Sequence, residues 1–214
     1  DPRCRRLLAA LSQSESLPRH LIYVGTTGIY GDCRGEWLDE TRPPAPQTPR
    51  ARRRLAAETR LREFGRRTGC RVSLLRAPGI YAAERLPRER LLAGTPTLRP
   101  EDDVYTNHIH ADDLAAACIA ALRRGRANRV YIVVDSGEMR LGEYFDAVAA
   151  ALGLPLPPRL SRSELAAAVS PVQLSFMSES RRIRNRRLLQ ELKLRLRYPH
   201  VGDTLATLPP PSVY

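Results

Sequence analysis

The sequence predicts an α/β fold in which helices cover a parallel sheet, followed by a small C-terminal lobe. Two observations predict it. Runs of strand-forming apolar residues alternate with longer segments of helical periodicity, and strand–helix–strand order implies parallel strands joined by right-handed crossovers. The apolar run at 21–24 also passes directly into glycine and threonine residues. Open parallel sheets bind ligands at the carboxyl ends of their strands, so we expect a site there.

The composition is typical of a globular protein. The chain has 214 residues, 43% of them hydrophobic and 27% charged, which is enough for a sizeable core. No apolar run approaches the roughly 20 residues that span a bilayer, and the N-terminus lacks the apolar core of a signal peptide. We therefore expect a cytoplasmic protein without a membrane partner. The four cysteines form no Cys-x-x-Cys pair, and His108 and His110 have no third ligand nearby, so no metal site is predicted.

The net charge of +12 raises nucleic acid as a partner, but its distribution argues against one. Lys193 is the only lysine among the 35 basic residues, and the arginines are spread along the chain. The two local runs, 50–54 and 181–187, lack the interleaved aromatic residues that stack on single-stranded bases. We interpret both runs as solvated helix faces and expect no nucleic-acid partner.

Helices are predicted where apolar residues recur at spacings of three and four and a cap or breaker bounds the segment. Pro49 opens the second helix, which is expected to end near Gly65, and Asp112 or Ala111 caps the fourth. The helices expected, in order, are 3–11, 49–64, 86–92, 113–122, 141–152, 164–169 and 183–192.

Strands are predicted where β-branched and aromatic residues gather or alternate with polar ones. We expect the first strand to be buried on both faces, and a proline-rich exposed loop at 35–49 to separate it from the second helix. The strands expected, in order, are 21–24, 71–76, 104–110, 129–134 and 194–196.

Four short motifs occur in order along the chain. They are Thr26-Thr27-Gly28-Ile29-Tyr30-Gly31, Asp39-Glu40, Arg76-Ala77-Pro78-Gly79-Ile80-Tyr81 and Ile109-His110-Ala111-Asp112-Asp113-Leu114. With helices between them, these motifs resemble the extended short-chain dehydrogenase/reductase superfamily, and more narrowly its atypical NAD-dependent epimerase/dehydratase-like branch. The resemblance covers nearly the whole chain, from Arg5 to about Tyr198.

This resemblance implies a partial Rossmann-like sheet that binds NAD or NADP, plus a small substrate lobe. Residues 1–150 would form the C-terminal part of the nucleotide-binding domain with interleaved lobe segments, 151–208 the lobe, and 209–214 a disordered tail. The implied activity is that of an oxidoreductase, epimerase or dehydratase acting on a nucleotide sugar or a similar small carbonyl or alcohol. A homodimer is left open. The family's glycine-rich phosphate loop belongs to its first strand and helix, and we expect that nothing here supplies Gly-x-x-Gly-x-x-Gly. The N-terminal part of the Rossmann domain is therefore expected to be missing.

The resemblance also implies the residues of the site. Thr26 matches the hydroxyl that bonds a substrate oxygen and stabilises charge on it. The turn at 78–80 matches the one that lies against the nicotinamide. The cofactor-binding residues implied are Gly25, Thr26, Thr27, Arg54, Pro78, Gly79 and Ile80.

Arg50 and Arg54 stand where the family has the tyrosine and lysine of its proton relay. An arginine does not release its proton in a protein, so Arg50 cannot act as acid or base, whereas Arg54 can still donate to ribose hydroxyls. Tyr81, at the ligand edge of the sheet, is the best replacement and the second catalytic candidate after Thr26. Two hypotheses follow: an enzyme of atypical mechanism, or a catalytically inactive dinucleotide-binding or regulatory relative.

Overall fold

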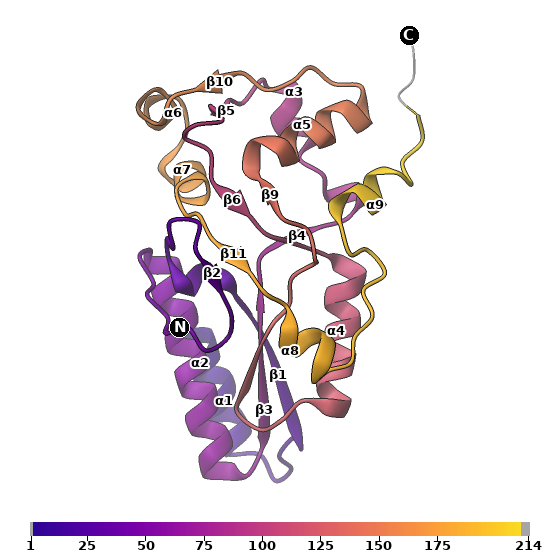
Figure 1. The fold of residues 1–214 in the computed structure, drawn as a ribbon. Coiled ribbons are helices and arrows are strands. Elements are labelled where there is room, and N and C mark those ends of the chain that lie inside the picture. The colour runs from indigo at the N-terminus through magenta and orange to yellow at the C-terminus, as the bar shows by residue number, and fades with distance from the viewer. Residues whose placement is uncertain (1, 211–214) are drawn as a thin grey trace.

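A three-stranded parallel sheet in the order β1–β3–β8 forms the lower half of the molecule (Figure 1). The structure is a computed structural model that describes residues 2–210. In the sheet β1–β3–β8, Leu21 pairs with Val72 and Leu74 pairs with Val130. The predicted α/β fold with a parallel sheet and flanking helices is confirmed. The strands are β1 (His20–Thr26), β2 (Trp37–Leu38), β3 (Arg71–Ala77), β4 (Gly79–Tyr81), β5 (Thr97–Leu98), β6 (Tyr105–Thr106), β7 (His108–His110), β8 (Arg129–Ile132), β9 (Met139–Arg140), β10 (Arg159–Leu160) and β11 (Arg182–Ile183).

Helices cover both faces of this sheet. The helices are α1 (Pro2–Ser12), α2 (Pro49–Thr68), α3 (Arg88–Leu92), α4 (Ala111–Arg124), α5 (Leu141–Leu152), α6 (Arg162–Ala168), α7 (Pro171–Met177), α8 (Arg186–Gln190) and α9 (Val201–Leu205), with short 3-10 helices η1 (Thr27–Tyr30) and η2 (Ala83–Arg85). Side chains alternate along β3, so Val72 and Leu74 pack against α1 and α2, with Phe64 among their neighbours. Leu75 faces the other way and packs with α4 and with Leu188 of α8.

β1 lies at the edge of the sheet rather than inside it. Within residues 2–210 it pairs only with β3, its residues are half-buried, and 38% of Val24 is exposed. The prediction of a strand buried on both faces is therefore wrong, although the parallel pairing is confirmed. The four-residue apolar run could not reveal this, because neighbouring strands and helices decide how far a strand is covered.

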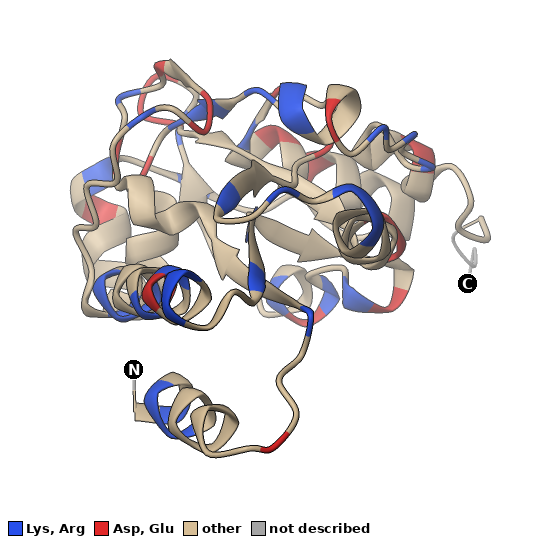
Figure 2. Cartoon of the chain, turned by 90° about the horizontal axis from the view of Figure 1, so that it is seen from below, with Lys and Arg blue, Asp and Glu red and all other residues tan. Residues whose placement is uncertain are grey.

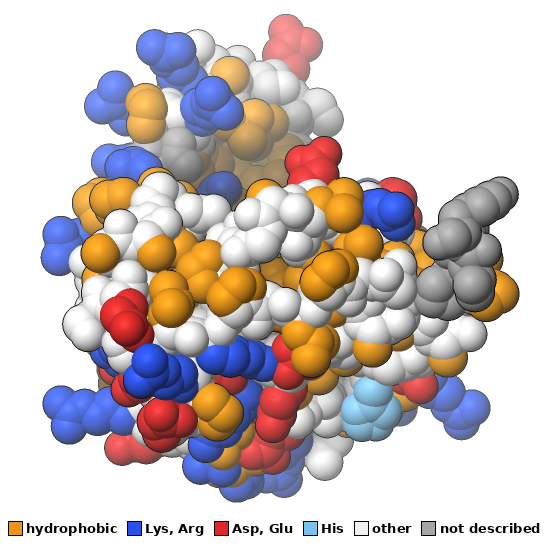
Figure 3. All heavy atoms as spheres, turned by 90° about the horizontal axis from the view of Figure 1, so that it is seen from above, with side chains coloured by type: hydrophobic (Ala, Val, Ile, Leu, Met, Phe, Trp, Pro, Cys, Tyr) orange, Lys and Arg blue, Asp and Glu red, His pale blue; other side chains and the backbone are white. Residues whose placement is uncertain are grey.

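A second group of elements, here called the upper lobe, comprises α3, β5, α5, β10, α6, α7 and α9 (Figure 1). Its core gathers Leu91, Phe145, Val148 and Val201 from three of these helices. Figure 3, the view onto this lobe, shows apolar side chains interspersed with polar surface. The packing crosses the predicted boundary at residue 150, because α3 and α5 lie in the lobe whereas α8 packs on the sheet. The proposed division into domains stays a prediction.

α2 is longer than its pattern predicts, because the glycine expected to end it serves another purpose. A Cβ on Gly65 would lie 2.8 Å from the backbone oxygen of Cys70, so this glycine allows α2 to pack closely against the chain entering β3. The helix ends at Thr68, and Gly69 closes it in the left-handed conformation with φ of 73°.

Three predicted elements are wrong in detail because tertiary contacts decide them. The strand at 104–110 is divided at Asn107, whose side chain donates to the backbone oxygen of Arg181 at 2.9 Å. The helix at 183–192 consists of β11, which pairs with β2 in the loop predicted to be exposed, and of the shorter α8. Residues 194–196 form no strand, and α7 lies in a segment predicted to be irregular.

The remaining predictions concern the surface and the end of the chain. Figure 2 shows Lys and Arg residues on helices and loops around the molecule, interspersed with acidic residues. Within residues 2–210 no helix is long and apolar enough to cross a membrane. Of the predicted disordered tail, residues 209–210 are irregular and 211–214 lie outside the described residues.

A buried ion pair joins α2 to β3 beneath the end of β1. Arg76 donates to both carboxylate oxygens of Glu58, at 3.1 and 2.7 Å, and to the hydroxyl of Tyr30 in η1 at 2.6 Å. The three residues are at most 3% exposed. Since the fork of the guanidinium matches the carboxylate, this contact fixes α2 and η1 relative to the strand ends.

Glu58→Gln should lower the free energy of unfolding by about 3–5 kcal/mol, because it leaves the charge of Arg76 buried without its counter-ion. Glu36→Gln, in the exposed pair with Arg42, is the matched control and should cause no comparable loss. Urea denaturation of both variants checks this. Equal losses in the two variants would contradict it.

Candidate active site

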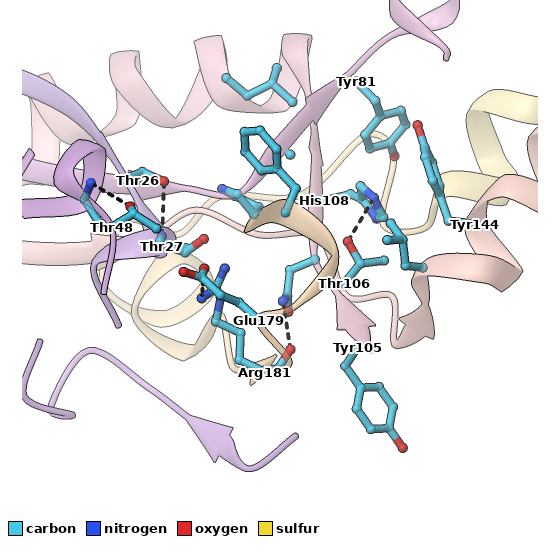
Figure 4. Close-up of a pocket in the computed structure, with 18 of the residues that line it drawn as sticks. Thr26, Thr27, Thr48, Tyr81, Tyr105, Thr106, His108, Tyr144, Glu179 and Arg181 are labelled. Carbon is cyan, nitrogen blue, oxygen red and sulfur yellow. Dashed lines mark hydrogen bonds and ion pairs between the residues drawn. The ribbon is translucent and has the colours of Figure 1, made fainter. Parts of the chain in front are cut away.

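A cavity of about 290 Å³ opens between the carboxyl end of the sheet and the upper lobe (Figure 4). Threonines that follow β1 and precede α2 lie on one side of it, and aromatic side chains of β4, β7 and α5 lie on the other. The segment after α7 contributes Glu179 and Arg181. The lining residues are Thr26, Thr27, Gly28, Thr48, Arg50, Ala51, Pro78, Gly79, Ile80, Tyr81, Tyr105, Thr106, Asn107, His108, Leu141, Tyr144, Phe176, Glu179 and Arg181.

Two of the threonine hydroxyls cap the starts of helices, Thr26 that of η1 and Thr48 that of α2. Thr26 accepts the backbone N–H of Gly28 at 3.1 Å at the start of η1, and Thr48 accepts that of Ala51 at 3.2 Å at the start of α2. Each bond holds the hydroxyl oxygen in place. A hydroxyl that accepts such a bond still has its own hydrogen to donate, so both groups can donate to an oxygen in the cavity.

The charged residues of the lining differ in how they are paired. Arg181 donates to Glu179 at 2.7 Å and to the backbone oxygen of Gly31 at 2.6 Å. Arg50 is exposed, and its guanidinium lies over the ring of Phe176, 4.2 Å from the centroid. Among residues 2–210 no hydrogen bond or ion pair engages Arg50.

The aromatic side of the cavity is deeply buried. The ring of His108 stacks on Tyr144 with centroids 4.2 Å apart, and Tyr81 meets it edge-on at 6.1 Å. Burial lowers the pKa of His108 to about 4, so this histidine is neutral near pH 7. Burial, followed by the charge of Asp135, raises the pKa of Tyr81 well above its ordinary value. That direction is opposite to the one a tyrosine needs to act as a base near neutrality.

The cavity brings together most of the residues that the resemblance implies, and leaves two outside. Gly25 and Arg54 are absent from the lining. A Cβ on Gly25 would lie 3.2 Å from a carboxylate oxygen of Glu58, so this glycine makes room for the buried ion pair. Arg54 is exposed on α2, one turn after Arg50. The lining includes the predicted residues Thr26, Thr27, Pro78, Gly79, Ile80 and Tyr81.

Gly25 and the two glycines of the first motif have the spacing of a phosphate loop without its geometry. Gly25, Gly28 and Gly31 fit Gly-x-x-Gly-x-x-Gly, so the expectation that the chain supplies no such pattern is wrong for the spacing itself. A phosphate loop leads directly into a helix whose N-terminus holds the anion. Here Gly25 lies within β1, the next residues form the single turn η1, and α2 begins only at Pro49.

The fourth motif is structural, with a different capping residue from the one predicted. His110, not Asp112 or Ala111, caps α4, because its Nδ1 accepts the backbone N–H of Asp112 at 3.1 Å. Asp113 is buried and accepts the backbone N–H groups of Arg197 and Tyr198 at 2.8 and 2.9 Å. The motif therefore ties the C-terminal segment to the start of α4.

Several lining residues escape sequence reasoning because they come from distant segments. Asn107, Tyr144, Phe176 and Glu179 follow no motif, and only the fold brings them to the strand ends. Thr48 was accessible from the sequence, because a threonine directly before a proline at a helix start is a capping signal.

Comparison with known proteins identifies the family. The model of the NAD dependent epimerase/dehydratase family matches residues 4–134. The chain belongs to this family. The motifs at Thr26, Glu40 and Arg76 lie inside the matched region, and the fourth motif, around Asp113, does too. The resemblance predicted from these motifs is confirmed.

Solved structures show the same fold, and a curated relative matches part of the sequence. A conserved protein of unknown function from Silicibacter pomeroyi is 31% identical, covers 94% of this chain and 68% of its own, and has a TM-score of 0.78. The dTDP-glucose 4,6-dehydratase DesIV of Streptomyces venezuelae, solved with NAD, is 19% identical over 95% of this chain and 62% of its own, with a TM-score of 0.75. Human dTDP-D-glucose 4,6-dehydratase is 23% identical over 133 residues, 58% of this chain. The chain spans 38% of the length of that curated relative. That the present chain lacks the N-terminal part of a Rossmann domain stays a prediction.

Close to the aromatic side of the cavity lies a buried carboxyl group. Asp135 follows β8, is 3% exposed, and accepts the backbone N–H of Gly137 at 3.1 Å through Oδ1, while Oδ2 has no partner among the described residues. Burial, reinforced by the charges of Asp113 and Asp203, raises its pKa to about 8. Asp135 is therefore mostly protonated near neutral pH.

This proton makes stability depend on pH. An unfolded aspartate titrates near 4, so protonated Asp135 contributes fully below that pH and its contribution is lost as pH rises through about 8. Between pH 7 and 8, above the range in which His108 titrates, each unit of rising pH should lower the free energy of unfolding by up to about 1.4 kcal/mol through the loss of this proton. Asp135→Asn should remove this slope, as urea denaturation at several pH values can test. An unchanged slope in the variant would contradict the assignment.

Proposed function

We propose that the protein containing this chain is an NAD(P)-dependent oxidoreductase, epimerase or dehydratase that acts on a small alcohol or carbonyl, such as a nucleotide sugar. The observation that carries the proposal is the Thr26 hydroxyl, held by the N–H of Gly28 at the mouth of a cavity lined by the turn at 78–80. The family is NAD-dependent, and relatives have been solved with NAD or NADPH.

The described residues fit the nicotinamide end of such a cofactor better than its phosphates. A Cβ on Gly79 would lie 3.2 Å from the ring of His108, so the backbone at this turn approaches its neighbours closely and leaves Ile80 39% exposed beside the cavity. No described helix begins directly after the glycines at 25–31, so the pyrophosphate lacks the helix N-terminus that usually holds it. We therefore expect weak cofactor binding by residues 1–214 alone.

The bound nicotinamide supplies or accepts a hydride, and the chain's own residues position the substrate. Thr26 donates a hydrogen bond to the substrate oxygen on which charge develops, with its own oxygen fixed by Gly28. Thr48 offers a second donor from the start of α2. Tyr81 remains the proposed second catalytic residue, with the raised pKa of its hydroxyl as the feature that disfavours it.

A second candidate function is a dinucleotide-binding relative without catalysis. It is favoured by Arg50, because a guanidinium at the cavity mouth cannot take or give the proton that the family's tyrosine transfers. Hydride exchange between a nicotinamide and any substrate would exclude this candidate. Nucleotide binding without exchange, by a protein that includes the whole domain, would favour it over the enzyme.

Thr26→Val should lower turnover of a nucleotide sugar by on the order of 10²–10³, because it removes one donor to the developing charge. Thr26→Ser keeps the hydroxyl and should retain most of the activity. Thr59→Val, on α2 and away from the cavity, is the matched control. The absorbance of the reduced nicotinamide follows an oxidoreductase reaction, whereas chromatography of the sugar product follows an epimerase or dehydratase reaction, because these return the hydride and form no net reduced nicotinamide. Unchanged turnover in Thr26→Val would remove Thr26 from the mechanism.

A further inference from the structure

The guanidinium of Arg50 has no ion-pair partner in the described range 2–210, whereas the other charges of the cavity lining are neutralised. The lining contains one further arginine, Arg181, and one carboxylate, Glu179, and these two bond to each other at 2.7 Å. His108 is neutral near pH 7 because burial lowers its pKa. Arg50 therefore leaves the lining with one uncompensated positive charge.

The aromatic contact of Arg50 directs its donors without occupying them. The guanidinium lies over the ring of Phe176, 4.2 Å from the centroid. A cation–π contact engages no oxygen acceptor, and a guanidinium has five N–H donors. These N–H groups remain available to bind two oxygens side by side, the geometry that carboxylates and phosphates present.

The nearby polar groups are also donors. Thr26 and Thr48 each accept a backbone N–H, which leaves their hydroxyl hydrogens for a ligand oxygen. Both lie on the same side of the cavity in Figure 4. Thr48 caps the 20-residue α2 and Arg50 belongs to its first turn, where backbone N–H groups carry partial positive charge. This side of the cavity therefore offers donors to acceptor groups and carries no free carboxylate.

We propose that the ligand of this cavity carries an oxyanion, either a carboxylate or a phosphate ester, and that Arg50 binds it bidentately. The inference rests on the proposed function for the identity of the site and adds a requirement on the substrate. Arg50 is then a specificity-determining residue in the place where the family has a proton-transferring tyrosine. The volume of about 290 Å³ is just below the roughly 300–1,000 Å³ of ligand sites, so the bound part has the size of a monosaccharide.

The test is calorimetric binding of three related probes, D-glucose, D-glucuronate and D-glucose 1-phosphate, to the 214-residue chain without nucleotide. At least one anionic sugar should bind at least tenfold more tightly than glucose, and the comparison between the two shows which oxyanion is preferred. Arg50→Met should reduce the ratio of anionic-sugar affinity to glucose affinity at least tenfold, and should change the affinity for glucose by less than about twofold. Arg52→Met removes an equal charge from an exposed position of the same helix outside the lining, and should change the preference by less than about twofold.

Two results would overturn the proposal. One is glucose binding as tightly as both anions, or no measurable binding of either anion. The other is an equal loss in Arg52→Met and Arg50→Met, which would assign the preference to the overall charge of +12. Because the assay contains no cofactor and follows no turnover, its failure is distinguishable from failure of the proposed enzyme activity. Phe176→Leu is a second variant, which replaces the aromatic ring by another apolar side chain and keeps the charge of Arg50. It should weaken anion binding less than Arg50→Met, because only the contact that orients the guanidinium is lost.

Discussion

The buried ion pair between Arg76 and Glu58 is the contact on which the geometry of the site depends. Arg76 belongs to β3, Glu58 to α2, and Tyr30, which shares the guanidinium, to η1. One side chain thus joins the three segments whose ends line the cavity. Gly25 permits this arrangement, because a side chain there would meet the Glu58 carboxylate. Tyr30 and Arg76 lie outside the lining of the candidate active site, and they still determine the shape of that site.

The cavity that results is lined by Thr26, by the turn at 78–80 and by Arg50. In our proposal the first two face substrate and nicotinamide, whereas Arg50 offers a permanent charge at the position to which the resemblance assigns a titrating hydroxyl. A permanent cation favours binding of an anion over transfer of a proton. The same substitution therefore weakens the case for the family's usual chemistry and points to a more specific ligand.

Capping residues and the spacing of apolar residues along the chain predicted the individual helices and strands that depend on local sequence. Pro49 with apolar residues at helical spacing located α2, and the β-branched run ending at Val134 located β8. The order of motifs was sufficient for the fold class and for the family. The edge position of β1 was not accessible, because burial depends on which strands and helices lie beside it. Asn107 lies between β6 and β7, and its side chain donates to the backbone oxygen of Arg181, a partner far along the chain that local sequence does not reveal.

The site was predicted to a similar extent. Thr26, Thr27 and the turn at 78–80 follow directly from the motifs, whereas Phe176 and Glu179 reach the cavity through the fold of the upper lobe. The role of Arg50 needed both sources. The sequence showed that it cannot act as an acid, and only the structure showed that it has an aromatic neighbour and, in the part of the chain that is described, no carboxylate partner.

Amide hydrogen exchange in Arg76→Met tests most directly whether the buried pair organises the site. The amides of Gly28 and Ala51, bonded to the hydroxyls of Thr26 and Thr48, should lose protection, because η1 and α2 are no longer held to β3. The amide of Glu164, bonded to Ser161 in the upper lobe, should keep its protection. Unchanged protection at Gly28 and Ala51, or an equal loss at all three amides, would contradict the account.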